Sequence, residues 1–130
     1  MRDALIVSTA RTPLTKSYRG TFNNTTAPTM AGWAIEEAVK RSGVDPEKVD
    51  DVIMGAALQQ GTQHCNVARN SALAAGLPVS VSGMTLDRQC SSGMMAIATA
   101  AKQIISDGMD VAVGGGLDSI SLVQTKKMNL

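Results

Sequence analysis

Short apolar runs alternate with longer segments of helical periodicity along the chain. The apolar runs lie at residues 4–8, 52–54, 79–86 and 111–113. Each has the length of a strand rather than that of a helix, and Gly83 interrupts the third run. Because the first run is continuously apolar rather than alternating, it predicts a strand that is covered on both faces.

Three segments between these runs have the periodicity of helices. Residues 30–42 place apolar side chains on one stripe and charged i,i+4 pairs opposite it, which predicts an amphipathic helix ended by Gly43. Asn66 is a suitable N-cap for a second helix over residues 67–75. In the third segment, residues 94–105, the first two turns are apolar or small all the way round. This pattern is typical of a helix that protein encloses on every side.

The alternation of strands and helices predicts an α/β fold with parallel strands joined by right-handed crossovers. The polar segment at residues 16–28 has no periodicity and is interpreted as a loop. An enclosed helix needs a second layer beyond its own sheet, and a chain of this length has material for one sheet only. We therefore expect a sizeable apolar face that the remaining chain or a partner covers.

Composition and charge narrow the class of protein. With 44% hydrophobic and 18% charged residues, the chain is typical of one globular domain. The 12 Lys and Arg residues against 11 Asp and Glu give a net charge of +1, and the only aromatic residues are Tyr18, Phe22 and Trp33. A phosphate-binding surface and a base-stacking platform are therefore not expected, and no nucleic-acid partner is predicted.

Apolar length and cysteine content bear on the compartment. No apolar stretch approaches the roughly 18 residues that span a bilayer, and the first run is too short for a signal peptide. We expect no membrane span and a cytoplasmic location. The two cysteines, Cys65 and Cys90, are too few for a disulfide framework, which favours a reducing compartment.

Cys90 lies where a predicted strand ends and the third predicted helix begins. The unpaired N–H groups at a helix N-terminus favour a thiolate there. The small residues at positions 91–93 leave room for a substrate carbonyl to approach the sulfur, and open α/β sheets bind ligands at the carboxyl ends of their strands. A nucleophilic role is one interpretation, and a buried, inert cysteine is the other.

The residues around Cys90 carry a resemblance to a known family. The run Asp-Arg-Gln-Cys-Ser-Ser-Gly-Met at residues 87–94 resembles the nucleophile signature of thiolases, the CoA-dependent acetyltransferases. Four further segments are similar to thiolases and occur in the same order. They lie at residues 6–13, 52–55, 66–69 and 114–121. The resemblance therefore covers nearly the whole chain.

The resemblance implies a function. Cys90 is expected to attack an acyl-CoA carbonyl and hold the acyl group as a thioester, with its backbone N–H contributing to an oxyanion hole. The acyl group then passes to CoA, in thiolysis of 3-ketoacyl-CoA, or to a second acetyl-CoA, in condensation. CoA and acyl-CoA are the implied substrates, with no prosthetic group and no metal. A homodimer or a dimer of dimers is the implied assembly.

The implied fold is a thiolase-like N-terminal half, with a mixed or mostly parallel sheet and the nucleophile helix in a buried central layer. In the family, an activating histidine lies in a Gly-His-Pro motif and a second catalytic cysteine in a Cys-x-Gly motif. Neither motif occurs here. Residues 1–130 are therefore expected to form an incomplete N-terminal thiolase domain, without the loop domain and the C-terminal domain and without turnover by itself.

Two alternatives stay open: a non-catalytic half-chain that binds a partner subunit, and a ketosynthase-like member of the superfamily. His64 and Cys65 lie where the family has no catalytic motif and are interpreted as loop residues near a subunit contact. The residues that bind CoA are not assigned.

Some positions depart from the family pattern. Asp87 replaces the usual Asn, so that an extra carboxylate opposes ionisation of the thiol, and Asp118 replaces the more common Glu. The signature at residues 89–93 is more similar to the degradative 3-ketoacyl-CoA type.

Two further patterns carry structural expectations. The glycines at residues 114–116 predict a close backbone approach rather than a phosphate cradle. Met94 and Met95 are expected to fill the core.

Overall fold

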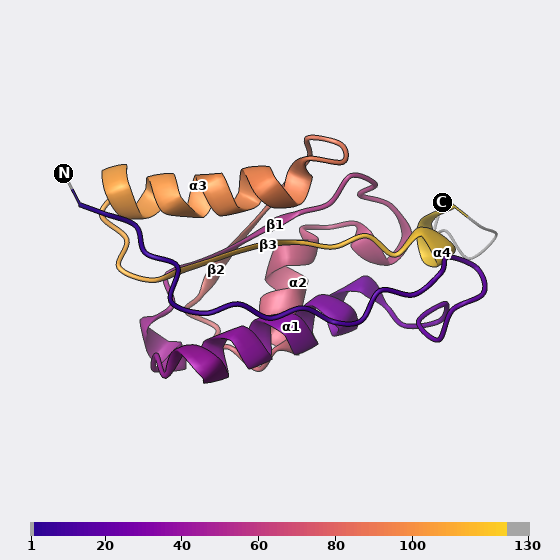
Figure 1. Ribbon diagram of the computed structural model, residues 1–130, viewed down its shortest axis with the longest axis horizontal. Coiled ribbons are helices and arrows are strands. Elements are labelled where there is room, and N and C mark those ends of the chain that lie inside the picture. Colours follow the sequence, from indigo (N-terminus) through magenta and orange to yellow (C-terminus); the bar gives the residue numbers. More distant parts are fainter. Residues whose placement is uncertain (1, 125–130) are drawn as a thin grey trace.

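A three-stranded parallel sheet forms the centre of the molecule, as the computed structural model shows for residues 2–124 (Figure 1). Its spatial order is β2-β1-β3. The strands are β1 (Asp51–Gly55), β2 (Ser82–Leu86) and β3 (Ala112–Gly116). The predicted α/β class with parallel strands is therefore confirmed. Met1 and residues 125–130 of the predicted domain lie outside the described residues.

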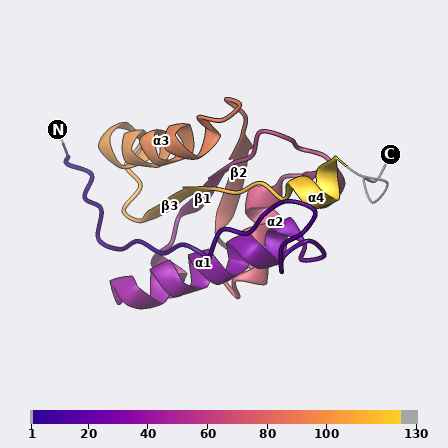
Figure 2. The same ribbon diagram turned by 45° about the vertical axis from the view of Figure 1, so that its right-hand side comes forward.

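Helices cover both faces of this sheet. The main helices are α1 (Ala27–Ser42), α2 (Val67–Ala74) and α3 (Ser92–Ser106). Shorter turns are η1 (Pro46–Lys48), η2 (Gly61–Gln63) and α4 (Ile120–Val123). Both ribbon views place α1 and α2 on one side of the sheet and α3 on the other (Figures 1 and 2). None of the helices described is long and apolar enough to cross a bilayer.

The helix termini follow the signals in the sequence. α1 begins three residues before its predicted start, because Pro28 fits the first turn of a helix, where its missing N–H is not needed. Gly43 ends α1 in the left-handed conformation, at φ 70°. Asn66 caps α2, and its side chain accepts a hydrogen bond from the Arg69 N–H. The second predicted helix and its cap are thus confirmed.

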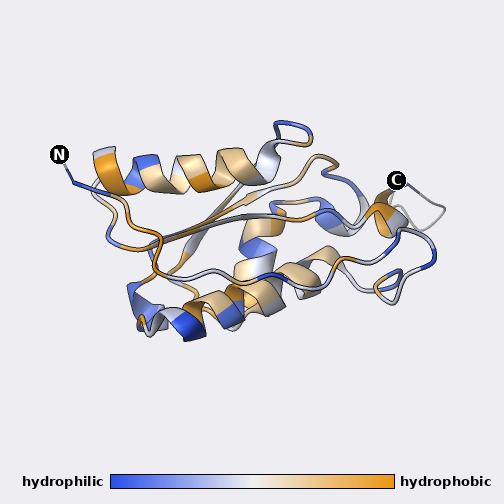
Figure 3. Ribbon diagram, in the orientation of Figure 1, coloured by the Kyte–Doolittle hydropathy of each residue, from blue (hydrophilic) through white to orange (hydrophobic). Residues whose placement is uncertain are grey.

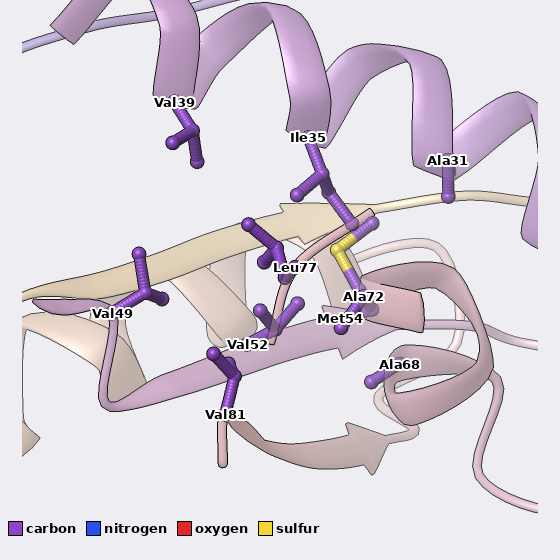
Figure 4. Close-up of a cluster of buried hydrophobic side chains, with 10 residues drawn as sticks. All are labelled: Ala31, Ile35, Val39, Val49, Val52, Met54, Ala68, Ala72, Leu77 and Val81. Atoms are coloured by element: carbon purple, nitrogen blue, oxygen red, sulfur yellow. The ribbon is translucent and has the colours of Figure 1, made fainter. Parts of the chain in front are cut away.

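Strand β1 sends its side chains alternately to the two faces of the sheet. Val52 and Met54 join the larger core cluster with α1 and α2, whereas Ile53 packs with Ala96 and Ala100 of α3. Figure 4 shows the larger cluster, in which side chains of α1 point toward β1. Its buried members are Ala31, Ile35, Val39, Val49, Val52, Met54, Ala68, Ala72, Leu77 and Val81. All five residues of β1 are buried, so this strand is the centre of the molecule.

Glycines allow α3 to lie directly on β3. A Cβ atom on Gly114 would come within 2.8 Å of the Ile97 Cα, and one on Gly116 within 2.7 Å of the Gly93 Cα. Contacts this short leave no space for a side chain on either strand residue. The predicted close backbone approach is confirmed at Gly114 and Gly116, whereas a Cβ on Gly115 would meet the Met54 side chain.

The outer face of α3 is uncovered in the part of the chain that the structure describes. Met94 is 76% exposed and Ile97 is 47% exposed. The prediction that Met94 fills the core is therefore wrong for the part of the chain that the structure describes. The inner face, with Ala96 and Ala100, lies on the sheet. Apolar residues are spread over the whole helix (Figure 3). The expected uncovered apolar face is therefore present, and it lies on α3.

The predicted first strand is not formed within the described residues. Residues 4–8 have no strand pairing, and the N-terminal segment leads from the start of the chain toward α1 (Figures 1 and 2). The segment is held by side chains instead: Arg2 donates to Asp110 and to the Gly108 carbonyl, and Arg41 donates to the Thr9 carbonyl. The apolar side chains of Leu5, Ile6 and Val7 are 76%, 79% and 69% exposed. A continuously apolar strand is stable where other elements cover both of its faces, and none of the described helices or strands covers residues 4–8 in this way.

Candidate active site

A cavity of about 480 Å³ opens at the carboxyl ends of the parallel strands. Gly55 and Gly116, the last residues of β1 and β3, line it together with Cys90. Residues 10–15 of the N-terminal segment and residues 117–121 beyond β3 form further parts of its wall. Ligands of open α/β sheets bind at this edge. The cavity therefore lies where the position of Cys90 predicted a site.

Cys90 sits on a tight turn between β2 and α3. The preceding residue, Gln89, adopts φ 51°, a left-handed conformation that costs a residue with a Cβ about 1–2 kcal/mol. The Asp87 carboxylate supports the turn by accepting a hydrogen bond from the Gln89 N–H at 2.7 Å. A nucleophile on a strained strand-to-helix turn is presented to solvent rather than to the core.

Ser92 holds the same turn from inside. Its hydroxyl accepts from the Arg88 N–H at 2.7 Å and donates to the Gln89 carbonyl at 2.6 Å. A Cβ atom on Gly55 would lie 2.1 Å from the Ser92 carbonyl carbon, so the end of β1 is in direct backbone contact with the start of α3. From the sequence, Ser92 is notable only as a small residue, and its hydrogen bonds to the turn are not predicted.

The thiol of Cys90 is exposed and free. It precedes Ser91, the N-cap of α3, which makes no side-chain hydrogen bond to the helix. The interpretation of Cys90 as a buried cysteine is therefore wrong. An accessible sulfur next to the N-terminus of a 15-residue helix is a suitable position for a thiolate nucleophile.

His64 and Cys65 do not join this site. They lie in the loop before α2, outside the cavity lining, and both are exposed. The His64 Nδ1 contacts the Cys65 Sγ at 2.6 Å. Because His64 is the one histidine of the sequence, no imidazole lines the cavity with Cys90.

A buried amide supports the far side of the cavity. Gln63 is fully buried, and its Nε2 donates to the Leu58 carbonyl at 2.7 Å and to the Asp118 Oδ1 at 2.9 Å. Its Oε1 accepts from the Ser119 N–H. Asp118 and Ser119 line the cavity. Sequence reasoning missed Gln63 because a glutamine in a polar loop carries no signal of burial.

Charged groups in the lining are few. Arg11 and Asp118 are the charged residues among the described residues that line the cavity. Within residues 2–124, the structure contains no cluster of three or more His, Cys, Asp or Glu side chains that could hold a metal ion. The chemistry that this arrangement offers is that of an accessible thiol.

Comparison with known proteins gives a consistent result. Residues 4–130 match the family described as the thiolase N-terminal domain. A 3-ketoacyl-CoA thiolase of Bacillus subtilis is 39% identical over 95% of this chain and 32% of its own length. An acetyl-CoA acetyltransferase of Cupriavidus necator is 40% identical over 93% of this chain and 30% of its own length.

A solved structure agrees with the fold. The crystal structure of the Bacillus anthracis acetyl-CoA acetyltransferase is similar with a TM-score of 0.87 and 44% identity, over 93% of this chain and 30% of that one. The chain thus spans about a third of the length of the curated relatives it matches.

Proposed function

This chain belongs to the thiolase family, and we propose that Cys90 is the nucleophile of an acyl-CoA acyltransferase. The observation that carries the proposal is the exposed, free thiol on a strained turn at the N-terminus of α3, which opens on the cavity at the strand ends. The names of the relatives, 3-ketoacyl-CoA thiolase and acetyl-CoA acetyltransferase, support CoA thioesters as the substrate class.

The proposed reaction has two steps. In thiolysis, the Cys90 thiolate attacks the C3 carbonyl of a 3-ketoacyl-CoA and forms an Sγ–C bond. The C2–C3 bond breaks, its electron pair stays on C2, and C2 takes up a proton to release acetyl-CoA. The thiolate of CoA then attacks the acyl-cysteine, forms the new thioester and releases the Cys90 thiolate. In condensation, the C2 carbanion of a second acetyl-CoA attacks the acetyl-cysteine instead.

The residues of this chain orient the nucleophile and receive charge. Asp87 and Ser92 fix the turn, so that the sulfur approaches the carbonyl in a set direction. N–H groups at the start of a helix stabilise negative charge of the kind that develops on the carbonyl oxygen. We propose the Cys90 N–H as one donor of the oxyanion hole.

The proton transfers require groups that this chain does not bring to the cavity. His64 is in contact with Cys65 and lies outside the lining. We propose that the activating histidine, the second cysteine and most of the CoA contacts belong to further parts of the enzyme. This chain would then be the nucleophile half of an N-terminal domain, in a homodimer or a dimer of dimers.

The acyl-cysteine is directly testable. We expect that the complete enzyme carrying these residues, incubated with acetyl-CoA and digested, shows one acetyl group on the peptide that contains Cys90. Mass spectrometry locates it. Cys65→Ala is the matched control, because it removes the other free thiol and leaves the turn intact. An acetyl adduct that survives Cys90→Ala would remove Cys90 from the reaction.

A further inference from the structure

A buried amide connects two loops at the edge of the sheet where Cys90 lies. We propose that Gln63 is a positioning residue, which fixes Asp118 and Ser119 in the wall of the cavity that contains Cys90. The proposal rests on the proposed function, because it concerns the rate of acyl transfer to Cys90.

The amide of Gln63 makes three hydrogen bonds, through both Nε2 hydrogens and Oε1. Both Nε2 hydrogens are donated, to the Leu58 carbonyl at 2.7 Å and to the Asp118 Oδ1 at 2.9 Å, and Oε1 accepts from the Ser119 N–H. At 0% exposure no water replaces these partners. A buried amide that loses a partner carries a desolvation penalty, so the geometry of the three bonds is strongly favoured over alternatives.

These bonds join segments that follow two neighbouring strands. Leu58 lies beyond β1, and Asp118 and Ser119 lie beyond β3. Asp118 also accepts from the Ala57 N–H through Oδ2, at 3.5 Å. The Leu117 N–H donates to the Gly55 carbonyl at 3.0 Å. The two chain segments therefore leave the sheet as one hydrogen-bonded unit, with Gln63 in its interior.

The unit is in contact with the nucleophile turn. Gly55 touches the backbone of Ser92, and Gly116 touches that of Gly93. Ser92 in turn holds the carbonyl of Gln89, the residue before Cys90. A shift of the loops beyond β1 and β3 would thus change the cavity wall and its distance from the sulfur.

The opposite edge of the sheet provides a matched control. There, the Gln103 Nε2 of α3 donates to the Asp51 Oδ2 at the start of β1, at 3.0 Å. This pair also joins a glutamine Nε2 to a carboxylate. Here the carboxylate of Asp51 is buried and Gln103 is half-buried, whereas Gln63 is buried and Asp118 is exposed. Neither Gln103 nor Asp51 lines the cavity. A purely structural role predicts that the transfer rate falls only as far as stability falls in each variant, whereas a positioning role predicts a loss of rate in Gln63→Met beyond its loss of stability.

The experiment measures acetyl transfer from acetyl-CoA to Cys90 in the complete enzyme, at saturating substrate, together with the thermal unfolding midpoint. We expect Gln63→Met to slow acyl transfer about tenfold or more, since small misplacements near reacting groups have effects of this size. Gln103→Met should lower the unfolding midpoint and leave the transfer rate within about twofold.

Asp118 variants keep the test decisive if Gln63→Met does not fold. Asp118 is exposed, so Asp118→Ala should fold. It removes one of the three bonds of Gln63 and should slow transfer, by no more than Gln63→Met does. Asp118→Asn keeps the Oδ1 acceptor and should restore most of the rate. The double variant should be about as slow as Gln63→Met alone, because that substitution already breaks the bond that the two side chains share.

Three results would overturn the proposal. The first is that Gln63→Met slows transfer no more than Gln103→Met. The second is that Asp118→Ala has no effect on the rate. The third is that the unmodified enzyme transfers no acetyl group to Cys90, which would overturn the proposed function as well. In the first two results acyl transfer to Cys90 itself still occurs, so the two failures are distinguishable.

Discussion

Asp87 supports the turn that carries Cys90 and brings a negative charge three residues before it. Its Oδ1 accepts from the Gln89 N–H, a bond that an asparagine can also make. The negative charge, in contrast, is present only in aspartate, and a carboxylate close to Cys90 would repel its thiolate. The two effects are separable by a substitution that keeps the acceptor and removes the charge.

We expect Asp87→Asn to increase the rate at which iodoacetamide alkylates Cys90, by roughly two- to fivefold at low salt. Two unit charges about 4 Å apart in water interact by about 1 kcal/mol, which sets the upper end of this range. Kinetics of alkylation followed by peptide mass spectrometry measure the effect. In about 1 M salt the difference should shrink, since the Debye length falls to about 3 Å.

The control for this substitution is Asp107→Asn. Asp107 is exposed and lies beyond the other end of α3 from Cys90. It should leave the alkylation rate unchanged. An equal rate in Asp87→Asn and the unmodified protein at low salt would show that the Asp87 charge does not act on the thiolate.

At the scale of residues, the sequence predicts Cys90 as the candidate nucleophile but does not predict the residues that hold its turn. Cys90 is bracketed by an apolar run and a helical segment, so its place between strand and helix follows from periodicity. The left-handed backbone of Gln89 does not, because glutamine gives no turn signal of the kind that glycine does. Ser92 and Gln63 hold the turn and the cavity wall through hydrogen bonds to residues that only the fold brings close, so the spacing of residues along the chain does not predict them.

Helix α3 lies against β3 because glycines remove the side chains between them. The same helix then presents its N-terminus to the cavity, so its depth on the sheet sets the position of Cys90. Gly114 and Gly115 are neighbours on β3 but meet different atoms. A Cβ on Gly114 would contact the Ile97 backbone at 2.8 Å, whereas one on Gly115 would contact the flexible side chain of Met54 at 3.2 Å.

We expect Gly114→Ala to lower the free energy of unfolding by about 2–3 kcal/mol, as overpacking against an immovable backbone does. Gly115→Ala should cost about 1 kcal/mol or less, because the Met54 side chain can change rotamer. Urea unfolding of the complete enzyme measures both. Equal losses in the two variants would mean that the α3 backbone does not rest on Gly114.

The elements themselves show where periodicity succeeds and where it fails. The helix over residues 67–75 and the strand over residues 52–54 are bracketed by caps and turns, and both are present with small changes of boundary. The run at residues 4–8 has the composition of a strand and forms none. Strand formation needs a partner edge and cover on both faces, and a local pattern reports neither.

At the scale of the molecule, the described residues combine an exposed apolar surface with a cavity that contains no imidazole. The outer face of α3 is exposed, as are Leu5 and Val7 of the N-terminal segment. The cavity holds the thiol of Cys90 but no imidazole. The described part of the chain thus presents an exposed apolar face together with a cavity that contains a thiol and no imidazole. The sequence predicted both, because an all-round apolar helix and a lone nucleophile each require further groups.

We expect the 130-residue chain on its own to show no thiolysis of acetoacetyl-CoA above background, while Cys90 still reacts with iodoacetamide. Alkylation needs only an accessible thiol, which the structure provides. Thiolysis also needs a group that moves protons between the thiols and C2, and His64 lies outside the cavity in contact with Cys65. Cleavage of acetoacetyl-CoA followed by absorbance measures turnover, with the complete enzyme as the positive control. Turnover by the 130-residue chain that disappears in Cys90→Ala and persists in His64→Ala would show that these residues complete the reaction without an imidazole.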